Sequence, residues 1–210
     1  MDINNIIFHI LVAGIPLIFA ITIHEAAHAY VAKWLGDKTA YNLGRTTLNP
    51  VPHIDPVGTV ALPLLMVLLH FPIIFGWAKP VPINYNNFKN FRRDVALVAF
   101  AGPFANIIMA IVWVLAFSLL GHYPYIQAMA IYGVMINVVL FVFNLLPIPP
   151  LDGSRIVSSF LSPQAAYKYN SIERYGFFII IALIMIPIGN SNILSILVNP
   201  ILHFIFGLIS

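Results

Sequence analysis

Apolar residues form long, nearly uninterrupted runs along this chain, and polar residues gather between them. The first apolar run covers 6–35, and a helix of that length measures about 45 Å, more than the ~30 Å hydrocarbon core of a bilayer. Two further runs, 95–121 and 126–146, are also long enough to span and are separated by a short turn. The pattern predicts spanning helices, of which the last two form an antiparallel pair.

The other apolar segments are interrupted or short. The run 57–75 contains Pro63 and Pro72, and proline disrupts helix interiors. The segments 176–188 and 193–209 hold 13 and 17 residues, which is short for a spanning helix. We expect C-terminal membrane segments there, without deciding whether each one crosses fully.

The composition also indicates a membrane protein. Hydrophobic residues make up 60% of the chain and charged residues 8%, whereas roughly a quarter of the residues in a soluble domain are charged. We expect an all-α polytopic membrane protein with one domain over 1–210, comprising a core over about 6–155 and C-terminal segments over about 172–210. The basic residues fall in short loops rather than one patch, so the lipid bilayer is the expected partner and nucleic acid is not.

Two histidines and a glutamate lie near the end of the first apolar run, in TIHEAAHAYVAKW (22–34). His24 and His28 are four residues apart, so on an α-helix they share one face and can bind the same ion. Glu25 can hold and deprotonate a water bound to that ion without being a ligand, which is the chemistry of H-E-x-x-H. Ionisable residues inside membrane segments are functional by default. The motif therefore predicts a catalytic metal rather than an incidental polar patch.

A catalytic zinc site needs a third protein ligand. Because the chain has no cysteine, that ligand must be a histidine, aspartate or glutamate. The strongest candidate is Asp152, just past a spanning helix in the proline-rich turn NLLPIPPLDG (144–153). The competing candidates are His53, Asp55 and His70. The spacing also allows Asp152 a structural role as the N-cap of a helix starting near Ser154.

Three motifs together resemble the site-2 protease family of intramembrane zinc metalloproteases, peptidase family M50. They are HEAAH (24–28) on the first spanning helix, GPFAN (102–106) on the next, and N-x-x-P-x-P-x-L-D-G (144–153) after it. The stretches HIDPVGT (53–59) and FGWAKPVP (75–82) are similar to those of the compact subgroup, which lacks an inserted PDZ or CBS domain. The resemblance covers roughly residues 15–155.

The resemblance implies that one Zn²⁺ is held by His24, His28 and Asp152. Glu25 would be the general base that activates the zinc-bound water and then protonates the leaving amine. The implied reaction is hydrolysis of a membrane-protein substrate within or near its transmembrane segment, as in regulated intramembrane proteolysis.

The resemblance also implies roles for two asparagines. Asn106 and Asn144 would contact the substrate or stabilise the oxyanion with their amide donors. The alternative for both is interhelical hydrogen bonding, which is common for asparagine in membrane helices. His53 and Asp55 belong to a motif of the compact subgroup and are candidates for facing the site.

Basic residues predict the orientation of the first helix. Lys33, Lys38 and Arg45 lie at its end or beyond, and no lysine or arginine precedes Lys33. The positive-inside rule therefore places the end of this helix on the cytosolic side. The metal site would lie near the cytosolic face of the cell membrane.

The same orientation constrains the segment 57–75. Asp152 can reach the metal only if helix 126–146 also ends on the cytosolic side, so its antiparallel partner begins there. The segment 57–75 then starts and ends on one side and cannot be a full span. We expect a re-entrant element, broken at Pro63 and Pro72 and covered by protein, with an edge that could hold a substrate strand by β-addition.

Two alternatives belong to another functional class, namely a membrane metal-ion transporter and a non-catalytic zinc-binding scaffold. A transporter would place ionisable groups along a path through several helices, and a scaffold would not need Glu25. Other intramembrane proteases fit less well, because a rhomboid needs a G-x-S-G serine and a presenilin-type enzyme needs two intramembrane aspartates. Metalloproteases with a glutamate as third ligand would have to use Glu173, which lies in a polar stretch.

Overall fold

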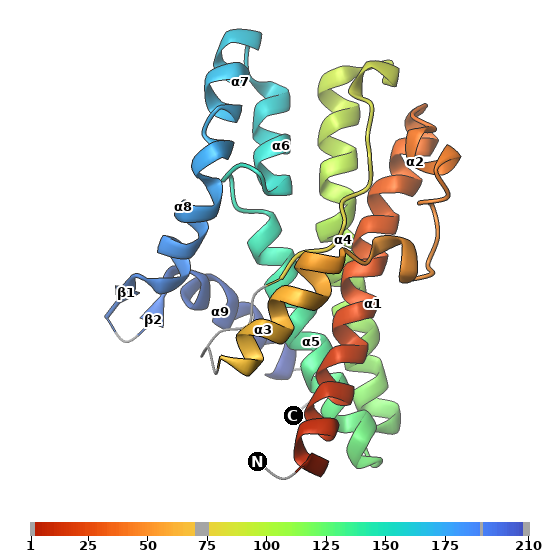
Figure 1. Ribbon diagram of the computed structural model, residues 1–210, viewed down its shortest axis with the longest axis vertical. Helices are drawn as coiled ribbons and strands as arrows, with labels where there is room; N and C mark the ends of the chain where they lie inside the picture. The colour runs from red at the N-terminus through yellow and green to blue at the C-terminus, as the bar shows by residue number, and fades with distance from the viewer. Residues whose placement is uncertain (1–2, 70–75, 190, 208–210) are drawn as a thin grey trace.

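A computed structural model describes residues 3–69, 76–189 and 191–207 of the chain. Within these residues the fold is mainly helical with very little strand, and three helices are long and apolar enough to cross a membrane (Figure 1). They are α1 (Ile3–Leu35), α4 (Phe91–Leu120) and α5 (Pro124–Asn144). The predicted all-α polytopic membrane fold is confirmed.

The second and third spanning helices begin earlier than the apolar pattern predicts. α4 starts at Phe91 because Asn90 caps it, accepting a hydrogen bond from the Arg93 N–H, while Asp94 in the first turn accepts from the Asn90 N–H. α5 starts at Pro124, since proline is favoured in the first helical position. Polar caps extend a helix beyond its apolar residues, and hydropathy alone does not detect them.

The three long helices pack against one another, and α4 and α5 form the predicted antiparallel pair (Figure 1). Ala20 and Ala32 of α1 are buried, and Ala32 packs in one cluster with Val95 and Val98 of α4. Small side chains of this kind let helix backbones approach closely in a membrane. The close approach brings α1 within reach of polar groups on α4.

Short elements occupy the connection between α1 and α4. They are α2 (Thr39–Asn42), the 3-10 turn η1 (Val51–His53), the π-helical η2 (Pro56–Ala61), α3 (Leu62–Leu68) and the 3-10 turn η3 (Tyr85–Asn87). α1 ends and α4 begins at the same end of the molecule, at the top of Figure 1, and α3 slants downward to the left of α1. A re-entrant element requires this arrangement. The chain is helical on both sides of Pro63 rather than broken there, and Pro72 lies outside the described residues.

The C-terminal part forms short helices and a small hairpin. Its elements are α6 (Asp152–Phe160), α7 (Pro163–Asn170), α8 (Glu173–Met185), the antiparallel strands β1 (Pro187–Ile188) and β2 (Ser191–Asn192), and α9 (Ile193–Gly207). α8 and α9 have 13 and 15 residues, fewer than the ~20 that a spanning helix needs. α9 packs on α5 through a cluster that includes Val138 and Val198.

Candidate metal centre

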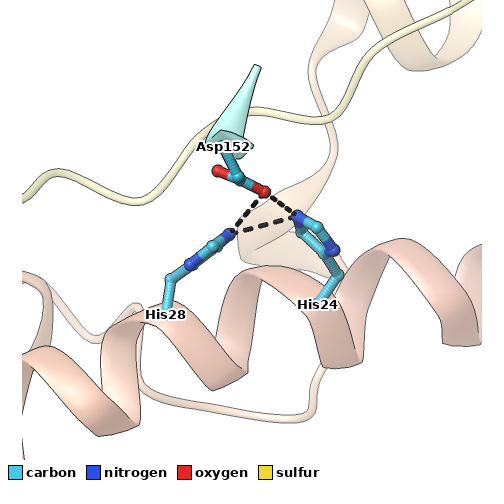
Figure 2. Close-up of side chains that lie close together, drawn as sticks. All are labelled: His24, His28 and Asp152. Carbon is cyan, nitrogen blue, oxygen red and sulfur yellow. Dashed lines mark hydrogen bonds and ion pairs between the residues drawn. The ribbon is translucent and has the colours of Figure 1, made fainter. Parts of the chain in front are cut away.

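The side chains of His24, His28 and Asp152 converge on one point (Figure 2). Oδ2 of Asp152 lies 3.1 Å from Nε2 of His24 and 3.3 Å from Nε2 of His28, and the two Nε2 atoms are 3.1 Å apart. Both imidazoles project from one face of α1, and the carboxylate comes from the first residue of α6. The structure thus brings together the three residues that the sequence singles out as metal ligands.

The spacing and chemistry of these three atoms fit a zinc ion. Bonds of about 2.0–2.1 Å in a tetrahedral site separate neighbouring ligand atoms by about 3.3 Å, close to the 3.1–3.3 Å found here. Oδ2 of Asp152 is buried and has no hydrogen-bond partner among the described residues. A buried, unsatisfied carboxylate oxygen facing two imidazole nitrogens favours a bound cation.

A group on α4 bonds to the Nδ1 atom of each histidine, while Nε2 faces the metal position. Nδ1 of His28 donates to the carbonyl oxygen of Val98 on α4 at 2.7 Å, and Nδ1 of His24 lies 2.6 Å from Oδ1 of Asn106, also on α4. A proton on Nδ1 leaves the lone pair of Nε2 directed at the site, which is how metal-binding histidines are oriented. Both imidazoles are therefore preorganised for a metal.

Asp152 is not the N-cap that the spacing allows as an alternative. Leu151 occupies that position, and Asp152 begins α6. Burial by itself raises the pKa of the Asp152 carboxyl, but the interactions with His28 and His24 together outweigh burial and hold this pKa well below its usual range. The group is consequently an ionised carboxylate at neutral pH.

Gly102 on α4 allows the two helices to approach at the site. A Cβ atom at this position would lie 2.6 Å from Nε2 of His24 and would also overlap Nε2 of His28. Any side chain there would occupy the space of the atoms that face the metal position. Only glycine is compatible with this arrangement of the imidazoles.

Glu25 is held by an extended segment, residues 76–84, which we call the strap. Oε2 of Glu25 accepts a hydrogen bond from the Val81 N–H at 2.8 Å. Other contacts also fix the strap, among them one from Nη2 of Arg45 to the carbonyl of Lys79 at 2.7 Å and one from the Asn84 N–H to Oδ2 of Asp37 at 2.8 Å. One oxygen of Glu25 is thereby anchored beside the histidine pair.

Two of the competing ligand candidates, His53 and Asp55, make hydrogen bonds within the connection between α1 and α4. His53 is buried, lies outside the metal cluster, and accepts the Lys79 N–H on its backbone carbonyl. Asp55 caps η2 by accepting hydrogen bonds from the N–H groups of Val57 and Gly58. His70 lies outside the described residues.

The two predicted asparagines have different environments. Asn106 is fully buried, and its amide nitrogen donates to the carbonyl of Ala20 and to Oδ1 of Asn137. These bonds favour the interhelical alternative over a substrate contact. Asn144 ends α5, is half-buried, and donates to the carbonyl of Leu140 at 3.1 Å.

Sequence reasoning overlooks Asn137. Its side chain is fully buried on α5 and bonds to Asn106. A signal was available, because Asn137 is a polar residue inside an otherwise apolar run and lies seven positions before Asn144, close to the same helix face.

Comparison with known proteins agrees with the geometry of the site. The chain is 40% identical over 186 residues to "Putative zinc metalloprotease YwhC" of Bacillus subtilis, and the match covers 84% of this chain and 81% of that protein. This chain belongs to peptidase family M50. The model of Peptidase family M50 matches residues 121–187.

More distant relatives of this M50 member have similar names. "Putative zinc metalloprotease Rip2" of Mycolicibacterium smegmatis is 29% identical over 88% of this chain and 70% of its own length. "Zinc metalloprotease MJ0392" of Methanocaldococcus jannaschii is 27% identical over 96% of this chain and 50% of its own length. No solved structure matches. The predicted enzyme class, a zinc-dependent metalloendopeptidase, is confirmed by the family and these relatives.

Proposed function

We propose that this M50 peptidase is an intramembrane endopeptidase that hydrolyses peptide bonds within or near the transmembrane segments of membrane-protein substrates, as in regulated intramembrane proteolysis. The observation that carries the proposal is the convergence of Asp152 with His24 and His28, two residues of a helix that is long and apolar enough to span a membrane. A site built into such a helix is closer to a membrane-embedded peptide than to one in bulk water. The basic residues that follow α1 support a position near the cytosolic face of the cell membrane.

His24, His28 and Asp152 would hold one Zn²⁺, which lowers the pKa of a bound water and polarises the scissile carbonyl. Glu25 acts as the general base, taking a proton from the attacking water and delivering it to the leaving amine nitrogen. The hydrogen bond from the Val81 N–H to Oε2 restrains the Glu25 carboxylate, so less of its conformational freedom is lost when the substrate binds.

Asn144 is the asparagine that we assign to the substrate. It lies at the end of α5, half-buried, eight positions before Asp152. This position, at the start of the turn that carries Asp152, supports a contact between its amide and a peptide bound at the site. Asn106, with its amide already bonded within the protein, supports the metal centre instead.

The test is Glu25→Gln, which removes the base and preserves the size of the side chain. We expect single-turnover cleavage of a model transmembrane substrate to fall by at least roughly 10² to 10⁴-fold, the contribution of general acid–base catalysis. Bound zinc should stay at the wild-type level, because Glu25 is not a ligand. The matched control is wild-type protein stripped of metal by a chelator, which should lose both zinc and cleavage. Cleavage by Glu25→Gln within a few-fold of wild type would remove Glu25 from the mechanism.

A further inference from the structure

A chain of buried hydrogen bonds extends behind His24 into the centre of the helix bundle. It begins between Nδ1 of His24 and Oδ1 of Asn106 at 2.6 Å and continues from Nδ2 of Asn106 to Oδ1 of Asn137 at 2.9 Å. It ends where Nδ2 of Asn137 donates to the carbonyl oxygen of Gly133 at 2.8 Å. Both asparagines have 0% exposure. Three helices, α1, α4 and α5, are thus joined by one polar relay.

The direction of every bond in the relay is fixed by backbone carbonyls. The carbonyl oxygen of Gly133 can only accept, so the Asn137 amide must direct its nitrogen there and its oxygen toward Asn106. The carbonyl of Ala20 also accepts from Nδ2 of Asn106, at 3.3 Å. The amide of Asn106 is therefore held with its oxygen toward His24.

This orientation determines where His24 carries its proton. An amide oxygen facing Nδ1 requires an N–H at Nδ1, and a neutral imidazole with that proton has its lone pair on Nε2. If the Asn106 amide turned over, its N–H would face Nδ1 and favour the opposite tautomer. Nε2 would then carry a hydrogen pointing at Asp152 and could not bind a metal.

We propose that Asn137 is a positioning residue of the metal centre. Acting through Asn106, it holds His24 in the Nδ1–H tautomer and thereby keeps Nε2 available for the metal. This inference rests on the proposed role of His24 as a zinc ligand. His28 needs no such relay, because Nδ1 donates directly to the Val98 carbonyl.

The burial of two amides in an apolar bundle favours a functional role over simple packing. Burying an amide away from water is unfavourable unless it is hydrogen-bonded, and here both the oxygen and the nitrogen of each asparagine side-chain amide are bonded. Asparagine pairs alone can join membrane helices. This pair differs because it ends on an imidazole whose other nitrogen faces Asp152.

The experiment compares Asn137→Leu with Asn137→Asp. Leucine removes the acceptor for Asn106, whereas a buried, protonated aspartic acid keeps the acceptor oxygen and can donate to the Gly133 carbonyl. Zinc affinity of the metal-free proteins in detergent is measured by competition with a chelating dye. We expect a loss of about 10 to 100-fold for Asn137→Leu, as for other partners of metal-bound histidines, and a loss of less than about threefold for Asn137→Asp.

A second measurement reads the tautomer itself. ¹⁵N chemical shifts of the imidazoles in metal-free wild type should report Nδ1–H for both histidines. In Asn137→Leu, His24 should gain the Nε2–H form while His28 keeps its tautomer as the internal control. Equal losses of zinc affinity in the leucine and aspartate variants, an unchanged His24 tautomer in Asn137→Leu, or a neutral Nε2–H form of His24 in wild type would each overturn the proposal.

A different result would mark failure of the proposed function instead. If wild-type protein bound no zinc, or if His24→Ala bound it as tightly as wild type, His24 would not be a ligand. The tautomer measurement on metal-free protein would still report whether the relay orients the imidazole. The two conclusions can therefore fail separately.

Discussion

At the scale of single residues, the two aspartates considered as the third ligand, Asp152 and Asp55, have different roles. Oδ2 of Asp152 is buried beside two imidazole nitrogens and has no hydrogen-bond partner among the described residues. Asp55 has its carboxylate occupied by the N–H groups at the start of η2. The first carboxylate is available to a cation, and the second is a helix cap.

Asp152→Ala should lower zinc affinity by at least about 100-fold, more than the loss of a supporting residue, because it removes a proposed ligand. Asp55→Ala is the matched control and should bind zinc like wild type, with a cost of about 0.5–2 kcal/mol in stability from the lost cap. Metal analysis of the purified variants distinguishes them. If Asp55→Ala is the variant that loses zinc, the third ligand is assigned wrongly.

The sequence suffices to predict the three candidate ligands, because the His24–His28 spacing and the turn at Asp152 are local patterns. The groups that orient the histidines are not local. Val98 and Asn106 lie 70 and 82 positions from the histidines they hold, and only helix packing brings them there. Asn137 is harder still to predict, because it is linked to His24 only through its hydrogen bond to Asn106.

At the scale of helices, the proposed metal centre depends on how closely α1 and α4 approach. Gly102 lies at the contact, against both imidazoles. The lengths of the spanning helices could be predicted from hydropathy, whereas this contact could not, because a glycine inside an apolar run gives no indication of its neighbours. The GPFAN motif marked the position without revealing its function.

Gly102→Ala should separate α1 from α4 or rotate the imidazoles, because the added methyl group overlaps Nε2 of both histidines. We expect zinc affinity to fall at least about tenfold, the lower end of the range for disturbed ligand orientation. The control is Gly14→Ala on α1, where a Cβ would meet nothing within 4 Å. Dye competition for zinc measures both variants, and wild-type affinity in Gly102→Ala would contradict the described contact.

At the scale of the whole molecule, the connection between α1 and α4 leaves and returns at the same end of the bundle (Figure 1). The parity of the spanning helices, which follows from the sequence, predicts this return. Its detailed path could not be predicted, because the strap is fixed by long-range contacts such as those of Arg45 and Glu25.

The topology predicts that Asn49 and Asn86 both face the cytosol. Both residues are exposed, and the chain has no cysteine, so Asn49→Cys and Asn86→Cys each introduce a single reactive thiol. We expect a membrane-impermeant thiol reagent to label both from the cytosolic side of sealed vesicles and neither from the other side. Labelling of Asn86→Cys from outside would refute the re-entrant arrangement and the geometry proposed for the site.

The metal cluster also joins distant parts of the polypeptide. His28 and Asp152 are 124 positions apart (152 minus 28), so an ion held between them closes a loop of that length. In the chain-entropy description of cross-links, closing such a loop disfavours the unfolded chain by about 5 kcal/mol. In this chain, which has no cysteine, the proposed zinc ion would thus act as a cross-link that stabilises the fold, as a disulfide does in secreted proteins.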